Sequence, residues 1–361
     1  MMQHWMMTGC GRGPGGLVVA PRLARSIGRR MHLSTYYSSS THICRCQDGR
    51  AVEHGDAVEV HYVEQVQQGD EQVVVRNSRV PEEKPLQFIV DDEKVVKGLE
   101  ELVVGMKVGD VRQAVVTPDK AYGERLSNMM AKLQKSQAPE GVKVGIQVGL
   151  QNGMTAVVTE EDDESFTIDA NHPLAGRDVG YEVELLSMSP KERIHEAFFG
   201  GGCFWGVELK FQRVPGVLDT EVGYSNGHVD GVTYEDVCSG QTGHNEVVRV
   251  RYDEGTISFE DLVTRFFDIH DPTTLDRQGN DVGTQYRSGI YVTSEEQKQV
   301  AERVIEDLQP KFSGQIVTEV DMVDKYNSAE DYHQQYLEKG GRFGRPQSAA
   351  KNCTDPVRCY G

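Results

Sequence analysis

The cysteine at position 203 has the setting of a reactive thiol. It follows three glycines and directly precedes Phe204 and Trp205, in the stretch GGGCFWGVELKFQRV that covers residues 200–214. The sequence predicts a helix that begins here, and the positive end of a helix dipole lowers the pKa of a thiol. Phe204 and Trp205 would offer an apolar wall beside the sulfur, which suits a small substrate with a methyl-bearing end. The alternative is a buried structural thiol among aromatic side chains.

Two further stretches supply acids and hydrogen-bond donors. Tyr234 and Glu246 lie in TYEDVCSGQTGHNEVV, and Asp281 and Tyr286 lie in the glycine-rich GNDVGTQYRS. Taken singly, each has an ordinary interpretation: a solvated strand residue for Glu246, a core aromatic for Tyr286, a turn residue for Asp281. Placed around a Cys-Phe-Trp pocket, they predict a site where a nucleophile works beside proton donors.

The distribution of the cysteines favours redox chemistry. Three lie near the N-terminus, two in the middle and two at the end of the chain: Cys10, Cys44, Cys46, Cys203, Cys238, Cys353 and Cys359. This is not the pattern of a secreted disulfide framework. The last pair has C-x5-C spacing with no second pair and histidine nearby, so we expect no metal site. No strand is followed by GxGxxG, so we expect neither a nucleotide nor a flavin, and no bound cofactor.

Composition limits the classes of partner. The chain has 361 residues, of which 38% are hydrophobic, enough for two or three domains. It contains no run of 18 apolar residues, so we expect no membrane span. The net charge of −18 argues against a nucleic-acid partner.

Residues 1–47 differ from the rest of the chain. They contain six arginines and no Asp or Glu, and they include the stretch MHLSTYYSSSTH. This composition is typical of an organellar transit peptide, and we expect a mitochondrial destination, with the plastid as the alternative. If the segment is instead a disordered basic arm, the protein would remain in the cytoplasm.

Residues 52–188 show a β-rich pattern punctuated by glycine. DAVEVHYVEQV and QVVVRNS predict a hairpin, VVKGLEELVVGMKVGD a short helix closed by Gly105, and DVGYEVELLSMS a closing strand. An insert at about 124–171 begins with ERLSNMMAKLQKSQ, for which we predict a helix, and continues with strands. The polar SPKER at 189–193 predicts a linker.

Residues 194–361 alternate between strands and helices. The strands predicted are HEAFFGG, HNEVVRVRYD, YRSGIYVTS and IVTEVDMV. The helices predicted begin at Cys203 and cover SFEDLVTRFFDIH, SEEQKQVAERVIEDLQ and SAEDYHQQYLEKGG. This mixture without a strict βαβ rhythm predicts a sheet with helices packed on it.

Four stretches, in this order, resemble peptide methionine sulfoxide reductase of the A type: GCFWG at 202–206, TYEDVCSGQTGHNEVV, GNDVGTQYRS and the tail GRFG…CTDPVRCYG. The resemblance runs from about Glu196 to the C-terminus and implies an α/β sandwich with a mixed sheet. It implies that Cys203 attacks the sulfoxide sulfur while Glu246 supplies a proton. Phe204 and Trp205 would cradle the substrate methyl. Three side chains would hold the oxygen, the last through water: Tyr234, Tyr286 and Asp281.

The resemblance also implies how the enzyme would be recycled. Cys203 would be left as a sulfenic acid, which a second thiol must resolve. Cys353 and Cys359 lie on a tail rich in glycine and proline, and thioredoxin would reduce the last disulfide. We expect Cys353 to attack first, and we interpret Cys238 as structural.

Residues 52–188 resemble an FKBP-type peptidyl-prolyl isomerase whose flap is replaced by a chaperone insert. The matching stretches are GDAVEVHYVEQV, VVKGLEELVVGMKVGD, PDKAYG, NHPLAG and YEVELL. Arg76 stands where relatives have an aspartate, which puts the isomerase rate in doubt but not peptide binding. Met129 and Met130 in the insert suit varied apolar clients or plain core packing. The resemblance implies an isomerase pocket lined by Tyr62, Val75, Leu86, Val95, Val96, Leu99, Tyr122 and Tyr181.

The sequence therefore predicts an α+β protein of two domains: an FKBP-like domain fused to a thioredoxin-dependent reductase of methionine S-sulfoxide. We expect its partners to be oxidised proteins and peptides, free methionine sulfoxide and thioredoxin, and we expect a monomer. The alternative is a peptide-binding chaperone or isomerase with a redox-sensing thiol domain.

Overall fold

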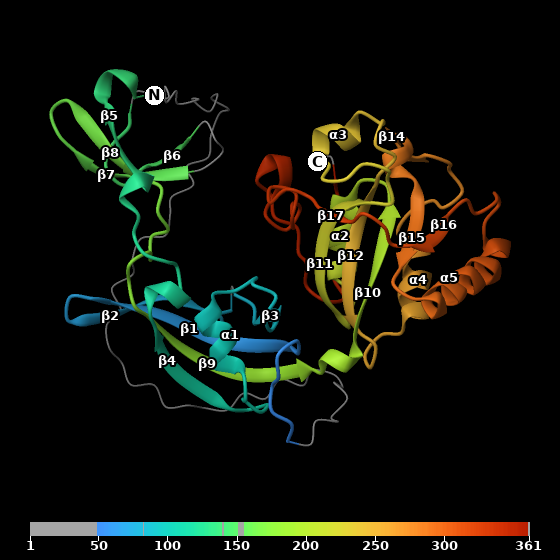
Figure 1. Cartoon of the computed structure of the whole chain (residues 1–361), viewed down its shortest axis with the longest axis horizontal. Helices are drawn as coiled ribbons and strands as arrows, with labels where there is room; N and C mark the ends of the chain where they lie inside the picture. Colours follow the sequence, from blue (N-terminus) through green and yellow to red (C-terminus); the bar gives the residue numbers. More distant parts are fainter. Residues whose placement is uncertain (1–48, 82, 139–140, 151–154, 360–361) are drawn as a thin grey trace. The chain divides into compact units, whose positions relative to one another are not determined.

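The computed structural model describes residues 49–81, 83–138, 141–150 and 155–359 (Figure 1). The predicted transit peptide at 1–47 lies outside this part of the chain. The chain forms two compact units: one combines Gln65–Val73 with Val115–Gly180, and the other combines Gln47–Glu64, Val74–Ala114 and Tyr181–Gly361. No helix in the described part is long and apolar enough to cross a membrane.

The front half is built on a sheet with the strand order β2-β1-β9-β4, and β3 pairs antiparallel with β1. The predicted hairpin, the helix and the closing strand are all present. The helix α1 (Lys97–Val103) buries Leu99 and Val103, and Gly105 follows it with a φ of 76°. The strands are β1 (Ala57–Gln68), β2 (Glu71–Asn77), β3 (Leu86–Ile89), β4 (Val111–Val116) and β9 (Val179–Ser189).

The insert is a separate sheet with the order β5-β8-β7-β6. The helix predicted over 124–137 is wrong, because β5 occupies its middle between two 3₁₀ turns. The Asn171 side chain accepts from the Leu126 N–H and donates to the Leu126 carbonyl, replacing helical bonds, and Leu133 packs into a small core with Phe166. The strands are β5 (Met130–Gln134), β6 (Gln147–Gly149), β7 (Thr155–Glu161) and β8 (Ser165–Asp169).

The C-terminal half is built on a sheet with the order β16-β15-β10-β12-β11-β17. β15 and β16 are parallel, whereas the other pairs are antiparallel, so the sheet is mixed as predicted. The strand β11 was not predicted from the sequence. The strands are β10 (Ile194–Gly201), β11 (Val217–Ser225), β12 (Asn245–Asp253), β15 (Ser288–Val292), β16 (Glu319–Met322) and β17 (Asn327–Ser328), with a small ribbon of β13 (Arg277–Gln278) and β14 (Asp281–Val282).

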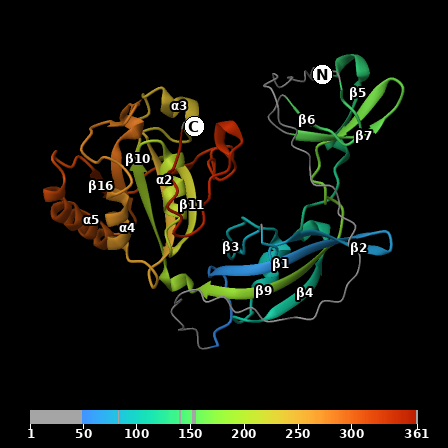
Figure 2. The same ribbon diagram turned by 180° about the vertical axis from the view of Figure 1, so that it is seen from behind.

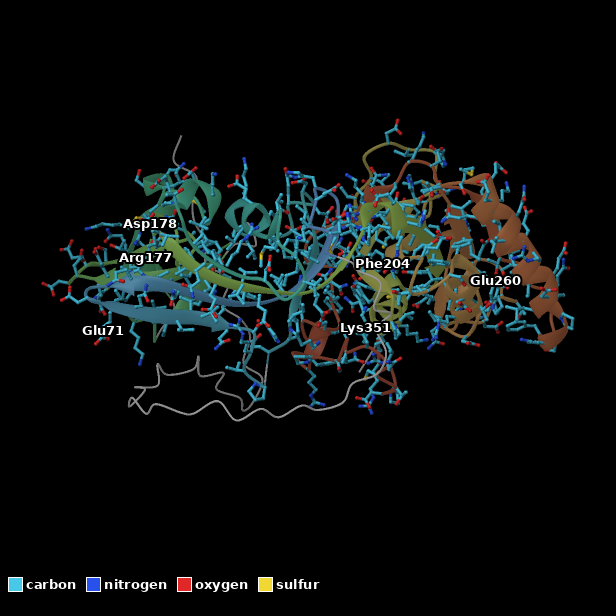
Figure 3. All side chains as sticks on the ribbon, turned by 90° about the horizontal axis from the view of Figure 1, so that it is seen from below. Glu71, Arg177, Asp178, Phe204, Glu260 and Lys351 are labelled. Carbon is cyan, nitrogen blue, oxygen red and sulfur yellow. The ribbon has the colours of Figure 1, made fainter. Side chains whose placement is uncertain are left out.

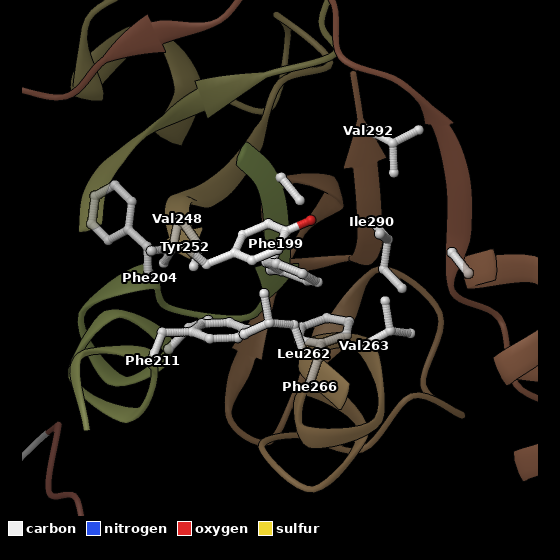
Figure 4. Packing of buried hydrophobic residues seen from close by; sticks show 14 of the residues in the cluster. Phe199, Phe204, Phe211, Val248, Tyr252, Leu262, Val263, Phe266, Ile290 and Val292 are labelled. Carbon is white, nitrogen blue, oxygen red and sulfur yellow. The ribbon is translucent and has the colours of Figure 1, made fainter. Parts of the chain in front are cut away.

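Helices pack on this sheet around an aromatic core. α2 (Phe204–Gln212) packs on β10, β11 and β12, while α4 (Phe259–Phe267) and α5 (Glu295–Leu308) lie side by side (Figures 1 and 2). The ring of Phe199 lies 4.7 Å from that of Phe211 and 5.2 Å from that of Phe266 (Figure 4). A short α3 (Tyr234–Cys238) begins with a capping box at Thr233.

The C-terminal helix predicted over 328–341 is wrong, because successive turns replace it. Gln335 has a φ of 49°, which no α-helix accommodates. The neighbouring Gln334 side chain accepts from the Val222 N–H and donates to the carbonyls of Val222 and Ala329. These bonds tie the segment to β11, and the amphipathic pattern in the sequence reflects that attachment rather than a helix.

Candidate active site

Cys203 lies where β10 turns into α2, and it is the N-cap residue of that helix. The turn depends on Gly202, which has a φ of 89°, and a Cβ there would lie 2.6 Å from the Gln278 side chain. Cys203 is half-buried as a residue. The strand-to-helix turn therefore presents the sulfur at the C-terminal end of β10, an interior strand of the sheet.

Glu246 lies beside this turn on the next strand. It sits in β12 opposite Tyr224 of β11, and it is 2% exposed. Its carboxylate accepts a hydrogen bond of 3.1 Å from the Phe204 N–H in the first turn of α2. Burial raises the pKa of Glu246 to about 8, the N–H bond opposes that rise, and the charge of Asp281 adds to it. The carboxyl is therefore largely protonated at neutral pH and can donate a proton.

The pKa of Cys203 differs from the value that the sequence predicts. Burial raises it, the charge of Glu246 raises it further, and the hydrogen bond from the Trp205 N–H only partly offsets these effects. The helix start does supply a donor, but the loss of hydration outweighs it. The expected lowering of the thiol pKa is therefore wrong for the free protein.

The other predicted acid and donors converge on the same place. Asp281 begins β14, Tyr286 ends a 3₁₀ turn, and Tyr234 begins α3. Burial is the largest cause that raises the pKa of Tyr286, and the charges of Glu246, Cys238 and Asp281 raise it further. Burial likewise raises the pKa of Tyr234, with a hydrogen bond to the Cys238 thiol as the next cause. Both tyrosines are protonated donors at neutral pH.

The two aromatic residues after Cys203 have different settings. Phe204 is 1% exposed and belongs to the core of the domain. Trp205 is only partly buried: its ring stacks on Tyr336 with 4.0 Å between centroids, and its Nε1 donates to His333 Nδ1 at 3.1 Å. Trp205 can therefore contact a substrate directly, whereas Phe204 is buried in the core.

Sequence reasoning missed the residues that hold these aromatics. His333 is 2% exposed and packs against Phe204, Trp205 and Tyr234. Glu330 accepts from the Tyr234 N–H at 2.9 Å and from the Tyr224 hydroxyl at 3.0 Å. Both lie in the segment 328–341, whose run EDYHQQY is rich in aromatic and polar side chains. The sequence pattern predicts only a helix for this run, although its aromatic and polar residue types are also typical of the wall of a binding site.

The cysteines of the tail occupy different places. A Cβ on Gly206 would lie 2.6 Å from Cys359 Sγ, so this thiol rests on the first turn of α2. The Cys359 charge is also among the causes that raise the pKa of Cys203. Cys353 lies in a turn closed by its N–H to the Ala350 carbonyl. Cys238 is exposed, beside Tyr234.

The predicted isomerase residues show graded burial. Leu99 and Tyr181 are buried, Val75 is exposed, and Tyr62, Leu86, Val95, Val96 and Tyr122 are half-buried. The Tyr181 hydroxyl donates to Glu64 at 2.7 Å, and Arg76 pairs with the same carboxylate at 3.7 Å. Arg76 therefore forms an ion pair with a buried acid, Glu64, which the sequence analysis does not single out.

Among the described residues no group of three or more His, Cys, Asp or Glu side chains is placed to hold a metal ion. The cluster around Cys203 offers a thiol, the carboxyl groups of Glu246 and Asp281, and two tyrosine hydroxyls as its chemical groups.

Comparison with known proteins identifies both halves. Residues 195–356 match the family model of peptide methionine sulfoxide reductase, and residues 48–186 match that of FKBP-type peptidyl-prolyl cis-trans isomerase. A reductase of Brassica napus is 61% identical over 165 residues, which cover 46% of this chain and 64% of that protein. Peptide methionine sulfoxide reductase A3 of Arabidopsis thaliana is 59% identical over 46% of this chain and 82% of its own.

A strawberry (Fragaria ananassa) reductase is 54% identical over 181 residues, or 50% of this chain and 95% of that protein. Among solved structures, reduced Mxr1 of Saccharomyces cerevisiae is 36% identical with a TM-score of 0.40, covering 42% of this chain and 88% of that one. The chain thus spans less than two thirds of the Brassica napus relative but most of several others. It belongs to the peptide methionine sulfoxide reductase family and carries an FKBP-type domain in front of its reductase domain.

Proposed function

We propose that this protein is an enzyme that reduces methionine S-sulfoxide, free and within proteins, to methionine. One observation carries the proposal: a buried Glu246 carboxyl with a pKa of about 8 is hydrogen-bonded to the helix turn that begins at Cys203. A sulfoxide sulfur is a poor electrophile until its oxygen is protonated or tightly hydrogen-bonded. A nucleophile and a neutral acid in one dry pocket meet that requirement. The S stereochemistry rests on the resemblance to the A type.

The reaction balances with these groups alone. The Cys203 sulfur bonds to the sulfoxide sulfur while Glu246 protonates the oxygen, and the thiol proton returns the Glu246 carboxylate to its neutral form. The oxygen then transfers to Cys203, the thioether leaves as methionine, and Cys203 becomes a sulfenic acid. The sulfoxide is reduced by two electrons and the cysteine is oxidised by two. Tyr234, Tyr286 and Asp281 hold the oxygen as charge develops on it, and Trp205 covers the methyl.

Recycling requires a second thiol and an external dithiol. A tail cysteine attacks the sulfenic sulfur, a disulfide forms, and water leaves. We propose thioredoxin as the reductant of the final disulfide, as the family resemblance implies. No bound cofactor takes part in this cycle.

We infer that the front domain binds clients and has at most a slow prolyl isomerase activity. The pairing of Arg76 with Glu64 supports this, because it places a cation where relatives have an acid. Met129 and Met130 are half-buried in the insert and are the soft side chains that varied apolar clients contact well. The domain limits 52–188, 189–193 and 194–361 remain part of this proposal.

We propose that residues 1–47 direct the protein to an organelle. Their arginine-rich, acid-free composition supports this. Two similar reductases, from Arabidopsis thaliana and Oryza sativa, are named chloroplastic, which favours the plastid over the mitochondrion that the sequence first suggested. Imaging a fluorescent fusion of the full chain tests the destination.

Turnover of free and peptide-bound methionine sulfoxide with thioredoxin tests the activity directly. The whole chain should release methionine, and Cys203→Ser should abolish the release, because an alcohol is essentially un-ionised at neutral pH. Retained turnover in that variant would sink the assignment. If the protein suppressed aggregation of unfolded clients without any turnover, the chaperone alternative would hold instead.

A further inference from the structure

The loop at residues 91–94 of the front domain has a backbone that must be held in place. Two of its four residues, Asp91 and Glu93, have φ values of 71° and 56°, although neither is a glycine. Residues other than glycine keep this left-handed conformation only where their surroundings impose it. The loop leads directly into Val95 and Val96, which the family resemblance assigns to the isomerase pocket. The contacts that fix the loop therefore also fix one wall of that pocket.

Two contacts within the front domain support the loop. The Glu93 N–H donates to the carboxylate of Glu100 in α1 at 3.2 Å, and the Asp91 carboxylate pairs with His54 at 2.7 Å. The side chains of Asp91 and His54 are both exposed, and exposed ion pairs stabilise a structure only slightly. The other two side chains of the loop bind residues of the C-terminal half.

Arg251 of β12 binds Asp92 of this loop through both ends of its guanidinium. Its Nη1 donates to Asp92 Oδ1 at 2.7 Å, and its Nη2 donates to Asp92 Oδ2. The same guanidinium donates to Asp219 Oδ2 of β11, and the Lys94 ammonium donates to Asp219 Oδ1 at 2.6 Å. Each charge of the loop thus meets a charge of opposite sign on the reductase sheet. We call Asp92, Lys94, Asp219 and Arg251 the charge clamp.

The central pair of the charge clamp is shielded from water. The side chains of Arg251 and Asp92 are 13% and 20% exposed. Burial raises the pKa of Asp92, but the hydrogen bond and the charge of Arg251 outweigh burial and leave this pKa below its ordinary value. A bidentate pair between a guanidinium and a carboxylate also fixes the relative geometry of its partners. The clamp therefore constrains the loop more strongly than the exposed pair of Asp91 and His54.

Other contacts join the same two parts of the chain. The strand β3 lies beside β11, and Lys84, just before β3, donates to Glu338 at 3.3 Å. Burial lowers the pKa of Lys351, labelled in Figure 3, to about 8, although the nearby charges of Glu59 and Glu338 oppose the fall. All these residues belong to the second of the two compact units. The charge clamp is thus one part of a wider contact within that unit.

We propose that Arg251 of the reductase domain is a positioning residue for the client-binding pocket of the front domain, where it acts through Asp92 on the loop that leads into Val95 and Val96. The pocket then accepts an apolar, proline-containing segment of an unfolded client, and it binds this segment tightly only while the reductase sheet holds the loop. Cys203 and Glu246 take no part in this role. The inference rests on the proposed binding of clients by the front domain.

Hydrogen exchange in the full chain tests the clamp directly. In Arg251→Met the guanidinium is lost, so the backbone amides of residues 91–96 should exchange severalfold faster, because the loop opens more often. Arg303→Met is the matched control, since it removes an exposed arginine of α5 that pairs with Glu260. It should leave the exchange of the loop unchanged. Unchanged exchange of the loop in Arg251→Met would overturn the inference.

Client affinity tests the positioning role. The probe is carboxymethylated, permanently unfolded α-lactalbumin, and calorimetric titration gives its Kd. If the released loop keeps the bound arrangement for about one tenth of the time, Arg251→Met should weaken binding about tenfold. The kcat and KM for free methionine sulfoxide should not change, which also reports that the variant folds. Unchanged affinity despite faster exchange would refute the positioning role. A lack of binding by the unsubstituted chain would instead refute client binding by the front domain.

Asp92→Ala approaches the same contact from the loop and keeps the inference testable if Arg251→Met does not fold. It should weaken binding of the unfolded probe as Arg251→Met does. Asp70→Ala, which removes an exposed acid from the turn between β1 and β2, is its control and should bind normally. The double variant of Arg251→Met and Asp92→Ala should bind no more weakly than the weaker single variant, because both changes break one contact. Additive losses of affinity would show that Arg251 does not act through Asp92.

Discussion

Glu246 influences the proton affinity of the neighbouring Cys203 thiol. The carboxyl is held neutral by burial, and the thiol is also held neutral, in part because an ionised Glu246 would lie beside it. The positions of the protons on Glu246 and Cys203 therefore matter for the chemistry that this site can carry out.

Glu246→Gln tests the role as proton donor. The amide keeps the size and can still accept from the Phe204 N–H, but it cannot donate an acidic proton. We expect the single-turnover rate to fall by about 10²-fold or more. Rapid-quench measurement of methionine release at saturating substrate gives this rate. Weaker substrate binding with an unchanged rate at saturation would make Glu246 a binding group instead.

The same substitution should change the titration of Cys203. Below about pH 8 Glu246 is protonated and adds no charge, and above about pH 8 its carboxylate raises the pKa of the thiol. Glu246→Gln removes that charge, so Cys203 should alkylate faster than in the parent above pH 8 and at the same rate below it. Iodoacetamide labelling of the Cys203 peptide, with Cys353 and Cys359 replaced by serine in both proteins, measures this. Superimposable pH profiles would contradict the coupling.

At the scale of elements, α2 combines several tasks. Its N-cap is Cys203, the proposed nucleophile, its first turn donates to Glu246, and one face contacts the tail at Cys359. A further acid, Glu208, is 1% exposed and faces Thr220 and Gln335. Burial raises the pKa of Glu208 to about 8, while the bonds from these two residues oppose the rise.

Glu208 should therefore make stability depend on pH. Its pKa is higher in the folded chain than in the unfolded one, so its contribution is complete below pH 4.5 and is lost as the pH rises through about 8. Glu208→Gln should flatten the fall in Tm between these limits. Differential scanning calorimetry across this range measures the slope. The pKa of Glu246 is also raised, so Glu246→Gln is the comparison variant. An equal slope of Tm against pH in the unsubstituted chain and in both variants would argue against ionisation of these buried carboxyl groups.

The sequence predicted elements well where caps and periodicity agree. α4 and α5 begin after Ser258 and Ser294, whose hydroxyls accept from the third N–H of each helix, and both were predicted. The prediction failed at 124–137 and 328–341. There the side chains of Asn171 and Gln334 bind distant backbone groups, and no local pattern encodes such a bond. The site residues on 328–341 were missed for the same reason.

At the scale of the whole molecule, the chain joins an FKBP-type domain to a methionine sulfoxide reductase domain. Oxidised methionine within a protein can be reduced only when its side chain is exposed, so partly unfolded chains are the best substrates. A client held by the front domain would raise the local sulfoxide concentration to about the millimolar range expected for a short tether. The advantage should vanish for a substrate that the front domain does not bind.

Comparing the full chain with residues 190–361 tests this idea. The full chain should reduce a dilute, oxidised, unfolded protein faster, while both proteins should treat free methionine sulfoxide equally. Arg76→Asp is the control that should raise proline isomerisation in a peptide assay without changing the reductase. Equal rates on the unfolded client at low concentration would show that the fusion has no kinetic role.

The setting of Trp205 has an optical consequence. The chain has two tryptophans, and Trp205 is the only one after residue 47. Its indole is hydrogen-bonded to His333 and stacked on Tyr336. In the sequence, Trp205 lies two positions after Cys203 and one before Gly206, which contacts Cys359. Its fluorescence should therefore change when the methyl group of a substrate binds beside Trp205. It should change again when a disulfide, which quenches tryptophan fluorescence, forms nearby. The protein thus contains its own label-free reporter, from which a stopped-flow instrument could time each stage of turnover.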